Sequence, residues 1–202
     1  MRSLGLTFLV ISIFLTAASA AGVLAPAPAP VSSAEFIRAS CENTMFPELC
    51  YQTLKGYANV VKKDLARLVK VSIGLTLTRA KFMSAYVENL IRQAQPEPPA
   101  ATLLSVCVEC YRDAEFYWRD SSKLMQRLSG NRKELRDQLN KVLSRISPVP
   151  TNEDDCTDAI ESISDPALKA AVFGRADEAR KGAFITFDLV ATIVRQAEPM
   201  VP

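Results

Sequence analysis

The chain contains five cysteines and no histidine, and these two facts limit the chemistry that its side chains can perform. Four of the cysteines fit a cross-linked framework in which Cys41 is bonded to Cys50 and Cys107 is bonded to Cys156. A bond from Cys110 to Cys156 is the alternative, because Cys107 and Cys110 lie on nearly the same face of a helix. Without histidine there is no Ser-His-Asp or Cys-His relay and no histidine zinc site.

The remaining reactive side chains are one extra cysteine and a number of carboxylates. We expect Cys110 to be a free thiol that packs like a small apolar residue, and an intermolecular disulfide is its alternative use. A carboxylate pair could support glycosidase-like chemistry, but such a site needs a cleft, which a filled helical bundle seldom provides. The sequence therefore predicts a protein that binds rather than catalyses, with no cofactor and no metal site.

Apolar residues recur every three or four positions along most of the chain, which is the pattern of amphipathic helices. The pattern predicts four helices, over residues 61–90, 104–128, 133–146 and 166–198. The first is ended by Pro96, Pro98 and Pro99, and the second by a turn at Gly130 and Asn131. Asp165 is expected to cap the last. Pro148 and Pro150 predict a kink, since each lacks a helical N–H donor, and Thr151 is expected to cap a restarted helix. Short connections between such helices predict an all-α, up-down-up-down four-helix bundle.

The first 31 residues read as targeting and linker segments. Residues 1–20 combine Arg2, an apolar run and a small-residue cleavage site at Ala18 and Ala20, so we expect a signal peptide that is removed. The apolar run is shorter than the roughly twenty residues needed to cross a bilayer, which argues against a retained anchor. Residues 21–31 form a Pro/Ala-rich linker. We expect the folded domain at 32–198, with a helical extension at 32–57 and the bundle at 60–198.

The charge balance excludes two classes of partner. Lysines and arginines number 24 and acids number 22, giving a formal net charge of +2, and the basic residues are spread along the chain. The sequence therefore predicts no binding to nucleic acid and, after removal of the signal peptide, no binding to a membrane.

Three cysteine-containing motifs follow one another along the chain. They are Cys41 to Cys50 with Thr44, Phe46 and Pro47; Cys107 with Tyr111, Asp113 and Ala114; and Ser147 to Cys156 with Thr151 and Asn152. In the same order they resemble the signatures Cys-x-x-Thr-x-aromatic-Pro-x-x-Cys, Cys-x-x-x-Tyr-x-Asp-Ala and Ser-Ala-Ala-Leu-Thr-Asn-x-x-Thr-Cys of the plant invertase and pectin methylesterase inhibitor family. The resemblance covers residues 35–196.

The resemblance implies a secreted plant protein of the apoplast or cell wall that inhibits an enzyme. In this family an N-terminal helical hairpin precedes a four-helix bundle, and the first two and the next two framework cysteines pair. The spacing to Tyr111 and Ala114 matches the family motif when it is counted from Cys107, which favours Cys107 as the partner of Cys156. The expected target is a pectin methylesterase, bound one to one by a monomeric inhibitor that occludes its cleft. A cell-wall or vacuolar acid invertase is the alternative target, although the Pro-Lys-Phe segment of invertase inhibitors is absent. A non-inhibitory helical protein that binds ligands or other partners is a more remote alternative.

The candidate contacts to the target are polar residues near the second and third motifs. Helical angles place Cys107, Tyr111 and Ala114 in the core and put Glu109 and Asp113 on the opposite, exposed side. With the positions that the resemblance adds, the candidate set is Glu109, Asp113, Thr151, Asn152, Asp155 and Asp158. The simpler alternative is that these groups are only solvated, and that the acids at 153–155 stabilise the first turn of a helix.

Two positions depart from the family pattern at this surface. Asp155 replaces a threonine that esterase inhibitors of the family carry beside the enzyme's catalytic aspartates, so carboxylates would repel unless one takes up a proton. Pro148-Val149-Pro150 replaces Ala-Ala-Leu and is expected to bend the helix that presents the surface. Together they leave an altered or lost target as the alternative to esterase inhibition.

Overall fold

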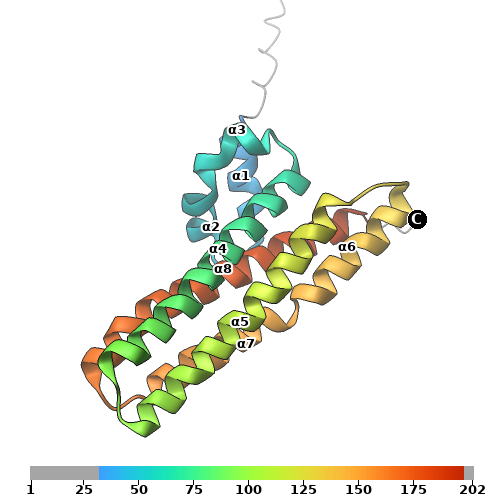
Figure 1. The fold of residues 1–202 in the computed structure, drawn as a ribbon. Coiled ribbons are helices and arrows are strands. Elements are labelled where there is room, and N and C mark those ends of the chain that lie inside the picture. Colours follow the sequence, from blue (N-terminus) through green and yellow to red (C-terminus); the bar gives the residue numbers. More distant parts are fainter. Residues whose placement is uncertain (1–31, 198–202) are drawn as a thin grey trace, which may run out of the picture. The chain divides into compact units, whose positions relative to one another are not determined.

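The fold is described here by a computed structural model, which describes residues 32–197 and contains no β-strand among them. The predicted signal peptide (1–20) and linker (21–31) lie outside the described residues, as does residue 198 of the predicted domain. Four long helical segments lie alongside one another, with the shorter N-terminal helices gathered near the beginning of the first long one (Figure 1). The predicted all-α bundle is confirmed.

The N-terminal extension is a small set of helices closed by a disulfide. It consists of α1 (Ser33–Cys41), α2 (Pro47–Leu54), the 3-10 turn η1 (Lys55–Tyr57) and α3 (Ala58–Val61). Ser32 and Glu35 form a reciprocal cap, in which the Ser32 hydroxyl accepts the Glu35 N–H at 3.1 Å and the Glu35 carboxylate accepts the Ser32 N–H at 2.6 Å. The Cys41–Cys50 disulfide joins α1 to α2 and confirms the predicted hairpin.

The first long helix, α4 (Leu65–Ala94), begins later than the apolar pattern predicts. Lys62 and Lys63 have positive φ values of 47° and 62°, so the chain leaves α3 in the left-handed region before α4 starts. The Asp64 side chain then caps α4 by accepting the Arg67 N–H at 3.1 Å. Val61 is buried, but in α3, and the prediction that one helix runs through residue 61 is wrong.

The predicted turn residues set the boundaries of the other helices. The structure contains α5 (Pro98–Gln126), α6 (Arg132–Ile146), α7 (Pro148–Glu161) and α8 (Pro166–Ala197). Gly130 has a φ of 102°, and Asn131 forms a capping box with Glu134 at the start of α6. The Asp165 side chain accepts the Ala167 N–H at 2.8 Å, as expected of a cap for α8. The prolines at 98 and 99 occupy the first turn of α5, where no N–H donor is needed.

The predicted break after α6 is present, but the helix restarts earlier than expected. α6 ends at Ile146 and α7 begins at Pro148, because Pro148 and Pro150 have no N–H to continue the hydrogen bonds of α6. Thr151 is therefore an exposed residue inside α7 and not its cap. The acids at 153–155 lie beyond the first turn of α7, so the expected stabilisation by the helix N-terminus is wrong.

The core lies between α4, α5, α8 and the α6–α7 pair. α4 packs on α5 and α8, while α5 also packs on α6 and α7. The largest side chains with almost no exposed surface include Trp118, Tyr111, Ile73, Met83, Leu104, Met125, Ile146 and Ile160. Among residues 32–197, no helix is long and apolar enough to span a membrane.

The second disulfide joins Cys107 on α5 to Cys156 on α7, with a Cα–Cα distance of 4.5 Å. This is the predicted pairing, and it leaves Cys110 outside both disulfides. Both bonded cysteines are fully buried, so the bond lies inside the bundle rather than on its surface.

Removing the second disulfide should destabilise the whole bundle. We expect Cys107→Ala with Cys156→Ala to lower the free energy of unfolding by about 2–4 kcal/mol, because the long loop between them is no longer closed in the unfolded state. Urea unfolding followed by circular dichroism measures this loss. Cys110→Ala is the matched control, since it removes a thiol from the same helix and keeps both disulfides; an equal loss in both proteins would contradict the prediction.

Candidate functional site

A shallow groove between α5 and α7 brings together four of the six candidate contact residues. It has a volume of about 520 Å³, and its lining consists of Thr102, Ser105, Val106, Glu109, Cys110 and Asp113 from α5 with Asn152 and Asp155 from α7. Thr151 and Asp158 are exposed on α7 but do not line the groove. The groove is therefore the candidate binding site, with Thr151 and Asp158 on the adjoining surface of α7.

The rotation of α5 determines which of its side chains reach the groove. Cys107, Tyr111 and Ala114 are fully buried, as predicted, so Glu109 and Asp113 point away from the core. The Cys107–Cys156 bond then fixes α7 close to α5, and Asn152 and Asp155 lie along the opposite side of the groove. The buried apolar stripe of α5 and the disulfide to α7 together position this set of polar groups.

The carboxylates of the groove differ in how far the protein neutralises them. Glu109 is paired with Arg112 at 2.8 Å, and Arg112 also reaches Glu88 on α4 at 2.9 Å. Within residues 32–197, neither Asp113 nor Asp155 forms an ion pair. The groove consequently presents negative charge and hydrogen-bond acceptors to whatever binds there.

Cys110 lies half-buried in the wall of the groove. Burial, together with the charges of Asp155, Asp113 and Glu153, raises the pKa of the Cys110 thiol to about 11. The thiol is therefore protonated at neutral and acidic pH, and a protonated thiol is a poor nucleophile for disulfide exchange. This supports the predicted packing role for Cys110 over intermolecular pairing.

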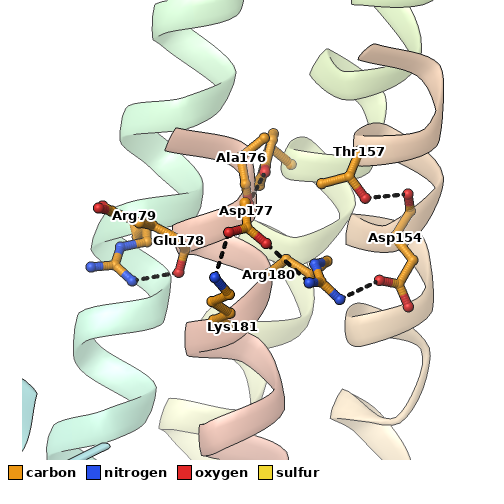
Figure 2. A network of polar contacts seen from close by, with 9 residues as sticks. Arg79, Asp154, Thr157, Ala176, Asp177, Glu178, Arg180 and Lys181 are labelled. Carbon is orange, nitrogen blue, oxygen red and sulfur yellow. Dashed lines mark hydrogen bonds and ion pairs between the residues drawn. The ribbon is translucent and has the colours of Figure 1, made fainter. Parts of the chain in front are cut away.

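A polar network behind the groove ties α7 to α8. Arg180 on α8 donates from Nη1 to Asp154 of α7 at 3.1 Å and from Nη2 to Asp177 at 3.0 Å. Lys181 also reaches Asp177, at 2.6 Å. Figure 2 shows Arg180 between the two aspartates. The network holds α7 from the side opposite to the disulfide.

The structure also contains a buried acid whose position the sequence predicted incorrectly. Glu153, expected in an exposed first turn, is only 2% exposed and lies inside the bundle. The spacing of the sequence does indicate this burial. Glu153 precedes Cys156 by three residues and Ile160 by seven, and residues at these separations share one face of a helix, here the buried face of α7. No group of three or more His, Cys, Asp and Glu side chains within the described ranges is arranged to hold a metal ion.

Replacing Asp155 should make Cys110 more reactive. We expect Asp155→Asn to lower the pKa of the Cys110 thiol, because the carboxylate that opposes thiolate formation is lost, and to raise the rate of iodoacetamide alkylation at pH 8 severalfold. Mass spectrometry of the native protein measures the rate. Glu109→Gln is the control, since Glu109 lines the same groove but is not among the charges that raise this pKa. Equal rates in the Asp155 variant and the wild type would contradict the expectation.

Comparison with known proteins agrees with the fold and the motifs. The family model described as plant invertase/pectin methylesterase inhibitor matches residues 35–183. The chain is 25% identical over 127 residues to pectinesterase inhibitor 4 of Arabidopsis thaliana, covering 62% of this chain and 64% of that protein. It is 32% identical over 109 residues to pectinesterase inhibitor 11 of the same plant, covering 53% of this chain and 52% of that protein. The chain thus spans about half to two thirds of the length of these relatives.

A solved structure shows a similar fold. It is the crystal structure of a mutant form of a pectin methylesterase inhibitor from Arabidopsis, matched with a TM-score of 0.52 at 15% identity over 85% of this chain and 98% of that one. At this identity the likeness concerns the fold alone. The family assignment comes from the family model, which matches well over half of the chain and includes both disulfides and the groove. The chain belongs to the plant invertase/pectin methylesterase inhibitor family.

Proposed function

We propose that this protein is a secreted inhibitor that binds a pectin methylesterase one to one and covers its substrate cleft with the surface of α5 and α7. The observation that carries the proposal is the groove in which Glu109, Asp113, Asn152 and Asp155 are held together by a disulfide-linked helix pair. Family membership supports inhibition rather than catalysis, and the names of the relatives, pectinesterase inhibitors, support the target.

Rigidity is the physical reason why such a surface can inhibit. A plug that is already folded loses little conformational freedom on binding, so more of its contact energy contributes to affinity. The disulfide and the Arg180 pairs fix α7 on two sides before any partner arrives. Steric occlusion requires no reactive group, in keeping with a chain that has no histidine and a protonated Cys110.

An acid invertase is the alternative target, because the family contains inhibitors of both enzymes. The absent Pro-Lys-Phe segment favours the esterase. Titrating the purified, oxidised protein against a pectin methylesterase and an acid invertase between pH 5 and 7 tests the proposal directly. Inhibition of the esterase alone would support it, whereas loss of invertase activity alone would identify the alternative. Full activity of both enzymes at micromolar inhibitor would refute it.

A ligand-binding role is the other alternative, and one crevice is relevant to it. The crevice lies between α2, α4 and α8, has a volume of about 370 Å³, and has mostly apolar walls that include Leu49, Leu54, Phe82 and Ile185. It lies outside the groove. If the protein leaves both enzymes fully active, ligand binding should be tested at this crevice.

Reversing one charge in the groove should weaken inhibition. We expect Asp113→Lys to raise the inhibition constant for the esterase about tenfold. The substitution replaces an unpaired negative hydrogen-bond acceptor at the proposed interface with a cation, which cannot accept a hydrogen bond and repels positively charged donors of the partner. Glu178→Lys, the same reversal at an exposed acid of α8 outside the groove, is the control. Steady-state inhibition assays measure both variants, and an equal effect of the two would place the interface elsewhere.

Asp155→Thr should have the opposite effect. It removes a carboxylate that would face the catalytic aspartates expected in the esterase, so we expect tighter inhibition. Steady-state inhibition assays of the variant and the wild type measure this difference. Unchanged constants would show that position 155 does not face the catalytic carboxylates.

A further inference from the structure

Glu153 carries a buried carboxyl group that does not line the groove and takes no part in either disulfide. It lies on α7, the side chain is 2% exposed, and its Oε2 has no hydrogen-bond partner within the described part of the chain. Buried polar atoms are nearly always hydrogen-bonded, and buried charges are nearly always paired. An orphan carboxyl oxygen at this depth is therefore a feature that needs a physical explanation.

The charged and titratable groups that face Glu153 come from every helix around it. Arg79 on α4, Arg180 on α8 and Asp154 on its own helix act on Glu153 through their charges, and Cys110 and Tyr111 on α5 lie near enough for the charge of Glu153 to act on them. Burial is the main effect that opposes ionisation of Glu153, the charge of Asp154 adds to it, and the two arginines favour ionisation.

Both arginines are already engaged with other groups. Arg180 binds Asp154 and Asp177, and Arg79 donates from Nη1 to the Glu178 carbonyl oxygen at 2.8 Å (Figure 2). The Tyr111 hydroxyl is directed to the Ala176 carbonyl oxygen at 3.4 Å. No ion pair reaches Glu153 among residues 32–197. The surroundings therefore suit a neutral carboxyl group and not a carboxylate.

The position of Glu153 couples its protonation to the groove. It lies next to Asn152 and two residues before Asp155, both of which line the groove, while Cys110 lies in the opposite wall. We propose that Glu153 is a proton-dependent lock on the packing of α7 against α5: the neutral carboxyl keeps the two helices closed, and its ionisation loosens α7 and with it the groove. This proposal is independent of which enzyme the groove binds.

The direction of the pH effect follows from proton linkage. Burial raises the pKa of Glu153 from an ordinary 4.5 to about 8, despite the opposing effect of Arg79 and Arg180. Below the ordinary value the carboxyl is protonated in both the folded and the unfolded chain. Between about 4.5 and about 8 only the unfolded chain releases the proton, so the stability of the fold falls as the pH rises through this window. Above it the folded protein ionises as well, and α7 loosens.

The test compares Glu153→Gln with the wild type and with Glu161→Gln, an exposed glutamate on the same helix. Urea unfolding of the oxidised proteins at pH 5, 6, 7 and 8 gives the unfolding equilibrium constant. We expect this constant to rise in the wild type, relative to Glu153→Gln, by up to about tenfold per pH unit. Glu161→Gln should follow the wild type. Parallel pH profiles for the wild type and Glu153→Gln would overturn the proposal.

A second measurement does not depend on the folding of a variant. Carbon-13 NMR of the wild-type glutamate side chains should show one carboxyl group that titrates near pH 8, with faster amide exchange in α5 and α7 above that pH once intrinsic exchange rates are taken into account. A set of glutamates that all titrate below about pH 6 would overturn the proposal, as would unchanged protection of α5 and α7.

Discussion

The contact between α5 and α7 is the interaction on which the rest of the structure depends. The Cys107–Cys156 bond holds the two Cα atoms 4.5 Å apart, a distance within the usual range for a disulfide, and so links the two helices covalently. It also fixes the rotation of α7, because Cys156 must point toward α5. Once this rotation is set, the direction of every other side chain on α7 follows from helical geometry.

α7 thereby has one face on which an acidic side chain is exposed and another on which an acidic side chain is buried. Asp155 immediately precedes Cys156 and is exposed at the groove, whereas Glu153 lies three residues before Cys156 and is buried. Asp154, between them, is held by Arg180 on the α8 side. Three consecutive acids thus meet three different surroundings: the core for Glu153, a cation for Asp154 and solvent for Asp155.

Much of this arrangement could be predicted from the sequence, since its causes are local or covalent. Cap residues such as Asp165 give helix boundaries, the buried stripe of α5 directs Glu109 and Asp113 outward, and the cysteine motifs give the disulfide that positions Asn152 and Asp155. The two errors have different causes. The apolar repeat continues from Val61 to Leu65, so it predicts one helix through this stretch. The left-handed conformation of Lys62, which ends α3, cannot be recognised from the spacing of apolar residues. Glu153 was misplaced because a wrong helix start put it in a first turn.

The proline break between α6 and α7 explains how the groove tolerates its departure from the family pattern. Pro148 and Pro150 end the hydrogen bonding of α6, yet both occupy the first turn of α7, where the missing N–H groups cost little. The break between the two helices lies at Ser147, before the first groove residue of α7. From Asn152 to Cys156 the helix is regular and anchored by the disulfide. The prolines thus interrupt the chain ahead of the groove while the helix that carries Asn152 and Asp155 stays regular, so Asp155 is the departure that changes the chemistry of the groove itself.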